Sequence, residues 1–65
     1  MAVQDKIAYH RNRLGLTQRE LAKKAGLTQG TIAKYELGHM NPSICALFRL
    51  AVALDVDASE LLPTR

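Results

Sequence analysis

The sequence contains a single cysteine, no metal-binding pattern and no long uninterrupted apolar run. The lone Cys45 excludes an internal disulfide, and no cluster of cysteine and histidine has metal-ligand spacing, so we expect no cofactor and a reducing, cytoplasmic environment. The longest apolar stretch, residues 44–54, is interrupted by Arg49 and is too short to span a bilayer. No signal-peptide pattern opens the chain. These absences predict a soluble cytoplasmic protein with no membrane partner.

Residue patterns typical of catalysis are missing as well. The sequence has no recognisable carboxylate pair, nucleophile with an adjacent base, or glycine-rich phosphate loop. A chain of 65 residues also leaves little room for a substrate pocket. His10 and His39 lie far apart in the sequence, so we expect exposed or hydrogen-bonded roles for both of them rather than catalytic or metal-binding ones. The sequence therefore predicts a protein that is not an enzyme.

Charge is unevenly distributed along the chain. The net charge is +3 and the pI is about 9.4, but residues 1–36 carry a net charge of +4 and residues 37–65 a net charge of −1. A basic front half and a slightly acidic, apolar rear half favour DNA on one side of the molecule and a protein partner on the other. Basic surface residues can also serve solubility alone, so the charge distribution by itself does not establish DNA binding.

Helical periodicity recurs along the whole sequence, without a strand pattern or an internal repeat. The length fits one small domain over residues 1–65. Apolar residues spaced by three and four, with capping residues between them, predict an all-α bundle of five short helices at about residues 3–14, 18–25, 29–37, 44–54 and 58–62.

Capping residues mark the expected helix boundaries. Thr17 and Glu20 form a capping box, in which each side chain accepts a hydrogen bond from the backbone N–H of the other. The other expected N-caps are Thr28, Ser43 and Asp57, the last of them with Glu60 in a second box. The first three helices are expected to end at residues that adopt the left-handed conformation without a Cβ penalty, namely Gly15, Gly26 and Gly38.

The expected core faces differ in width. The first helix has a narrow apolar face of Val3, Ile7 and Leu14. The fourth has the most hydrophobic face, made up of Ile44, Leu47, Leu50, Ala51 and Leu54. That helix also carries a second apolar stripe of Cys45, Phe48 and Val52, which one small core cannot bury as well. We therefore predict a homodimer whose two-fold interface covers Phe48, Val52 and Val56.

Residues 16–38 predict two short helices joined by a tight turn, a helix-turn-helix over about residues 17–37. Ala22 is small where the helices must cross, Gly26 permits the turn, and Ile32 fills the corner between them. Tyr35 is expected in the core or at its edge. The start of the second of these helices is left projecting, and a helix about 10–12 Å wide matches the DNA major groove, which is about 12 Å wide.

A series of short motifs follows in a fixed order over nearly the whole chain: Leu-Thr-Gln, Leu-Ala, Gly-Leu-Thr, Ile, Tyr-Glu, Gly, Asn-Pro-Ser and Leu-Leu. In this the sequence closely resembles the phage-repressor and Cro-like helix-turn-helix family (XRE type), which includes small controller proteins of restriction-modification systems. The resemblance implies a lambda-repressor-like fold and a transcription regulator, either a repressor or an activator-repressor. Such a protein binds a pseudo-palindromic operator in double-stranded DNA as a dimer. RNA polymerase is a further candidate partner.

The resemblance also implies roles for individual residues. The base-facing positions are Gln29, Gly30, Thr31 and Lys34, where glycine is a departure because a long polar side chain often stands at its position. The phosphate contacts are Gln18, Arg11, Arg13 and Asn41, with loop amides around Asn41 holding the DNA backbone. Arg11 and Glu36 resemble the family's ion pair between the first and third helices, so a structural role and a phosphate contact both stay open for Arg11.

The main alternative is a helix-turn-helix module that binds another protein, such as an antitoxin or an adaptor. Proteins of that class usually carry an additional partner-binding segment. Here the sequence ends at Arg65, soon after the last expected helix, which favours the free-standing regulator.

Overall fold

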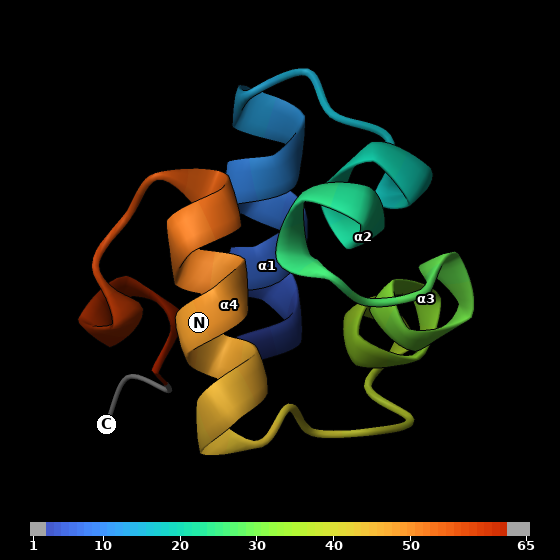
Figure 1. Cartoon of the computed structure of the whole chain (residues 1–65). Helices are drawn as coiled ribbons and strands as arrows, with labels where there is room; N and C mark the ends of the chain where they lie inside the picture. The colour runs from blue at the N-terminus through green and yellow to red at the C-terminus, as the bar shows by residue number, and fades with distance from the viewer. Residues whose placement is uncertain (1–2, 63–65) are drawn as a thin grey trace.

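The computed structural model describes residues 3–62, with the side chains of residues 5–62 (Figure 1). Its elements are four α-helices and one short 3₁₀ helix: α1 (Val3–Arg13), α2 (Gln18–Ala25), α3 (Gln29–Leu37), α4 (Ile44–Leu54) and η1 (Ala58–Leu61). Residues 3–62 contain no β-strand. The all-α prediction is confirmed, although the fifth element is a 3₁₀ helix of four residues rather than an α-helix. None of these helices has both the length and the apolar character needed to cross a membrane.

Local side-chain caps begin three of the helices, as predicted. The Thr17 hydroxyl accepts a hydrogen bond from the Glu20 backbone N–H at 3.1 Å, and the Glu20 carboxylate accepts one from the Thr17 N–H at 2.8 Å. Thr28 caps α3 through the Thr31 N–H, and Ser43 caps α4 through the Ala46 N–H, both at 3.2 Å. These caps fix where the two helices of the helix-turn-helix begin.

The second predicted capping box, at Asp57 and Glu60, is wrong. The Asp57 side chain makes no cap hydrogen bond. The Glu60 backbone N–H instead donates to the Asp57 carbonyl oxygen at 2.9 Å, which is the i to i+3 pattern of a 3₁₀ turn. Because that N–H is already taken, the Asp57 carboxylate has no free donor at the position where a capping box would need one.

The core draws residues from all five elements. The fully buried large side chains are Ile7, Leu21, Ile32, Leu50, Leu54 and Leu61. Tyr35 is also buried, as predicted. The prediction of burial in the core is wrong for two residues, because Leu14 is 44% exposed and Ile44 is 66% exposed. Leu14 follows the last residue of α1 and Ile44 is the first residue of α4, so both lie at helix ends where the neighbouring helices no longer cover them. The side chain of Val3 lies outside the described residues.

His10 departs from its expected role. It lies three residues after Ile7 on the same face of α1 and is only 8% exposed. Its Nδ1 atom is buried and has no hydrogen-bond partner among the described residues. The ring packs edge-to-face on Tyr9, with 5.1 Å between ring centroids. The expectation of an exposed or hydrogen-bonded histidine is therefore wrong at Nδ1, because helical periodicity places the residue against the core.

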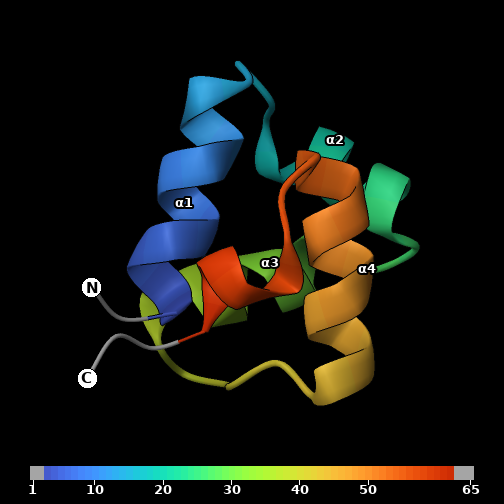
Figure 2. The same ribbon diagram turned by 90° about the vertical axis from the view of Figure 1, so that its left-hand side faces the viewer.

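The arrangement of the elements separates two sides of the molecule. α2 packs against α3 and α4, and η1 packs against α4 and α1. Figures 1 and 2, two views at right angles, place η1 and α3 on opposite sides of the helical bundle. The whole domain measures 30 × 23 × 20 Å. α3 is thus displayed on one side, away from the chain's C-terminal 3₁₀ helix.

Candidate nucleic-acid interface

The turn between α2 and α3 sets the angle at which α3 projects. Gly26 ends α2 with a φ of 71°, in the left-handed region that favours glycine. The backbone N–H of Leu27 then donates to the Ala22 carbonyl at 2.8 Å, which closes the turn. Ala22 is almost fully buried, and Ile32 of α3 is fully buried in the corner between the two helices. The three residues assigned to this turn from the sequence have the expected placement.

α3 has one buried side and one open side. Ile32 and Tyr35 point into the core, and Glu36 is held at its edge. On the other side Gln29, Gly30 and Lys34 are exposed, and Thr31 is half-buried. The structure therefore brings the four predicted base-facing residues to the solvent side of α3, with Gln29, Gly30 and Thr31 in its first turn and Lys34 in its last turn. The side chains there are uncharged or positive, which suits the electronegative floor of the major groove.

The Thr31 side chain has a restricted orientation. Its hydroxyl oxygen lies 2.9 Å from the Thr28 hydroxyl oxygen, and its backbone N–H donates to that same Thr28 oxygen. The local hydrogen bond engages the polar end of Thr31. The hydroxyl group keeps acceptor capacity beyond this bond, and the methyl group of Thr31 is a natural complement of the thymine methyl in the major groove.

A hydrogen-bonded ion pair joins α1 to α3. The Arg11 Nε donates to Glu36 Oε2 at 2.7 Å and its Nη2 donates to Glu36 Oε1 at 2.9 Å, a bidentate geometry. A third bond runs from Arg11 Nη1 to the Leu16 carbonyl at 2.8 Å. The hydrogen bond from Glu36 raises the pKa of Arg11, while burial opposes the rise. The structure contains the predicted ion pair, and Arg11 commits donors on all three of its nitrogens to the protein itself.

Gln18 lies at the first turn of α2, as the phosphate-contact prediction requires. The sequence did not indicate where its side chain points. The Gln18 amide nitrogen donates to Glu36 Oε1 at 3.2 Å, so the side chain joins the Arg11 ion pair. The backbone N–H of Gln18 remains at the N-terminal end of α2, where the helix dipole is positive and favours an anion.

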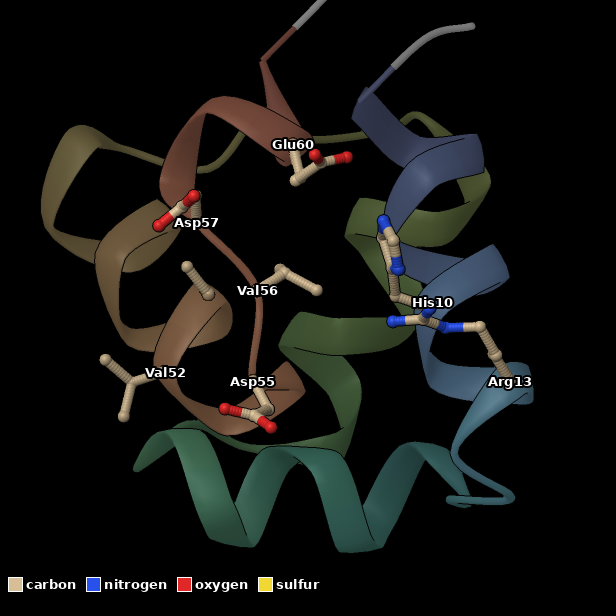
Figure 3. Close-up of a pocket in the computed structure, with 8 residues that line it drawn as sticks. His10, Arg13, Val52, Asp55, Val56, Asp57 and Glu60 are labelled. Carbon is tan, nitrogen blue, oxygen red and sulfur yellow. The ribbon is translucent and has the colours of Figure 1, made fainter.

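The remaining phosphate candidates lie in different places. Asn41 is exposed in the loop between α3 and α4. Arg13, in contrast, lines a pocket of about 550 Å³ between α1, the end of α4 and η1. Figure 3 shows His10 and Arg13 on one side of this pocket, facing Asp57 and Glu60. Because η1 lies on the opposite side of the bundle from α3, the structure does not bring Arg13 together with the base-facing residues.

Two of the three predicted interface residues, Phe48 and Val52, lie on an exposed apolar surface of α4, and the third, Val56, follows that helix. Phe48 is 58% exposed and Val52 is 81% exposed. Val56 is half-buried and packs against the core. Sequence reasoning missed Ile44, which is exposed one turn before Phe48 on the same side of the helix. Its position directly after the N-cap Ser43, where a helix end leaves the bundle, is the signal that could have identified it.

Comparison with known proteins agrees with this geometry. The Helix-turn-helix family model matches residues 7–61. An uncharacterised HTH-type transcriptional regulator from Methanothermobacter thermautotrophicus is 48% identical over 54 residues, which cover 83% of this chain and 78% of that protein. The crystal structure of the restriction-modification controller protein C.AhdI from Aeromonas hydrophila superposes with a TM-score of 0.89 at 32% identity, covering 92% of this chain and 91% of that one. The P22 c2 repressor, solved in complex with a synthetic operator, gives a TM-score of 0.89 at 26% identity, covering 95% and 94%.

Proposed function

Because the chain belongs to the helix-turn-helix family of transcription regulators, we propose that it binds a pseudo-palindromic DNA operator as a homodimer and thereby represses or controls transcription. The observation that carries the proposal is the division of α3 into a fixed inner side and an open polar outer side. A helix held in this way is able to enter the major groove without rearranging the core. The repressor and the controller protein that the fold resembles support a regulatory role.

Base edges and phosphates are contacted by different parts of the domain. Gln29 reads adenine through its amide, the Thr31 methyl meets thymine, and Lys34 reaches guanine or a phosphate. The α2 N-terminus at Gln18 and the loop at Asn41 hold the DNA backbone on either side of α3. Arg11 stabilises this arrangement through Glu36 rather than by binding DNA directly.

Two copies are needed because one domain is too small to read a whole operator. The longest dimension of the domain is 30 Å, and the half-sites of a helix-turn-helix operator are centred about 34 Å apart. One copy therefore covers one half-site. The apolar surface of Phe48 and Val52 is the natural contact between copies, because monomeric proteins rarely leave such residues together in solvent. A two-fold axis through this surface repeats the same contact on both copies.

Selection from a pool of random DNA duplexes tests the proposal. We expect the wild-type protein to enrich a sequence with two related halves and to bind it with two copies per duplex. Gln29→Ala should then lose about 1–3 kcal/mol on the selected duplex and little on a scrambled one, because only the selected duplex offers the matched donor and acceptor. Equal losses on both duplexes would remove Gln29 from the base-reading set.

The alternative function is a helix-turn-helix module that binds a protein. No particular contact in residues 3–62 favours it over DNA binding. It predicts that the wild-type chain enriches no duplex at all, so the same selection discriminates between the two functions.

A further inference from the structure

Gly30 occupies the second position of α3 without a backbone reason for being glycine. Gly15, Gly26 and Gly38 adopt positive φ angles, whereas Gly30 has ordinary helical geometry that any L-residue adopts. Packing gives no reason either, because, apart from its two chain neighbours and the nearby backbone of α3 itself, a Cβ built on Gly30 would meet no atom within 4 Å. The fold would accept alanine at this position.

Glycine at this position weakens the helix that carries the site. Relative to alanine, glycine in a helix loses more backbone freedom on folding and lowers helix stability. Within the described residues, no group beyond the neighbouring positions of α3 approaches position 30 to compensate for that loss. The part of the chain that the structure describes therefore supplies no constraint that favours glycine there, which directs attention to a bound partner.

The surroundings of Gly30 indicate where that constraint comes from. Gly30 stands between Gln29 and Thr31 and lies one turn before Lys34, so it shares the open side of α3 with all three. Gly30 is exposed and carries no side chain, so the helix backbone is accessible at this position. Glycine typically stands where a ligand must approach the backbone closely.

We propose that Gly30 is a close-approach position, at which the bound DNA packs directly against the Cα of α3. This inference rests on the proposed function and goes beyond it. The missing side chain allows α3 to sit deep enough in the groove for the short Thr31 side chain to reach a base. A side chain at position 30 would hold the helix away from the groove floor and separate Thr31 and Gln29 from their bases together.

The test compares Gly30→Ala, Gly30→Ser and Gly30→Gln with the wild type on a duplex that the wild type has selected and on a scrambled duplex. Gly30→Ala should raise the thermal unfolding midpoint, because alanine favours the helix. It should weaken binding to the selected duplex by about tenfold, the size of one lost base contact. Binding to the scrambled duplex should change little, and the loss should grow from Ala to Gln. Ser59→Ala, on η1 on the opposite side from α3, should leave binding to both duplexes unchanged.

Three results would overturn the inference. Unchanged or tighter binding of the selected duplex by Gly30→Ala or Gly30→Gln would mean that the position is merely vacant. A lower unfolding midpoint for Gly30→Ala would mean that the fold itself needs the glycine. If the wild type selects no duplex, the proposed function fails and the inference fails with it; if the wild type selects a duplex that Gly30→Ala binds equally well, only the inference fails.

Discussion

The ion pair between Arg11 and Glu36 makes a quantitative prediction about stability, tested by Glu36→Ala. The Glu36 carboxylate accepts three hydrogen bonds in all, from Arg11 Nε, Arg11 Nη2 and Gln18 Nε2. The two ionised side chains are only 15% and 9% exposed. Alanine at position 36 therefore leaves a guanidinium and an amide without their acceptor in a place that water reaches poorly.

The expected cost lies between two known limits. Exposed ion pairs contribute about 0–1 kcal/mol, and removal of one partner from a fully buried pair costs about 3–5 kcal/mol. This pair is nearly but not completely buried, so we expect Glu36→Ala to lower the free energy of unfolding by about 2–3 kcal/mol. For a domain of this size each kcal/mol moves the unfolding midpoint by about 4–8 °C, which predicts a fall of roughly 10–20 °C.

Thermal and urea unfolding at one fixed protein concentration measures the effect, since association also shifts the midpoint. Two variants serve as controls. Glu60→Ala removes an exposed carboxylate and should change the midpoint little. The double variant Arg11→Met with Glu36→Leu removes both charges together and should recover most of the loss, because neither charge is then left unpaired. A fall of less than about 3 °C for Glu36→Ala would refute the reasoning and show that water solvates the pair.

Three further predictions concern the helix start, the apolar surface and the pocket. Hydrogen bonding from the Thr17 backbone lowers the pKa of Glu20, so the capping box stabilises the fold above the ordinary glutamate pKa and loses this contribution as the pH falls through the folded-state pKa. The side chain in Glu20→Gln cannot titrate. In a plot of unfolding free energy against pH, this variant should therefore show a flatter fall on the acid side. Phe48→Asp should yield monomers in sedimentation at tens of micromolar, whereas Leu14→Asp, which changes an exposed apolar residue just after α1, should leave the protein dimeric. A monomeric wild type would show that α4 does not form a dimer interface. Arg13→Ala should leave the salt dependence of DNA binding unchanged, because Arg13 lines the pocket on the side away from α3. If the slope of log binding constant against log salt concentration became shallower by about one unit, Arg13 would be a phosphate contact after all.

Features that depend on a few neighbouring residues were predictable from the sequence. The capping box at Thr17 and the caps at Thr28 and Ser43 form because each requires only a side chain and an N–H three residues later. The turn at Gly26 and the buried positions of Ile32 and Tyr35 follow from backbone freedom and helical period. These local rules were enough to predict which side of α3 is buried, whereas the base-facing role of residues on its open side was implied by the family resemblance and stays a prediction.

Features that depend on where other helices end were not predictable in the same way. The exposure of Ile44 and the burial of His10 reflect which stretches of α4 and α1 are covered by neighbours. The hydrogen bond from Gln18 to Glu36 joins residues that are 18 positions apart in sequence. The capping rule fails at η1 because the Glu60 N–H donates to the Asp57 backbone carbonyl instead of to the Asp57 side chain.

The shared acceptor on Glu36 links the stability of the fold to the geometry of the proposed DNA-reading surface. Glu36 lies near the end of α3, and it binds Arg11 of α1 and Gln18 at the start of α2. Gln18, which we propose to contact a phosphate, and α3, which carries the proposed base-reading residues, are thus both held by one carboxylate. These hydrogen bonds set the relative position of the two elements in the free domain. Under the proposed function, DNA binding would then require little further ordering of them. For this reason a change at Glu36 should weaken binding to the selected duplex even at temperatures where the variant remains folded, although Glu36 itself lies on the side of α3 that faces away from the groove.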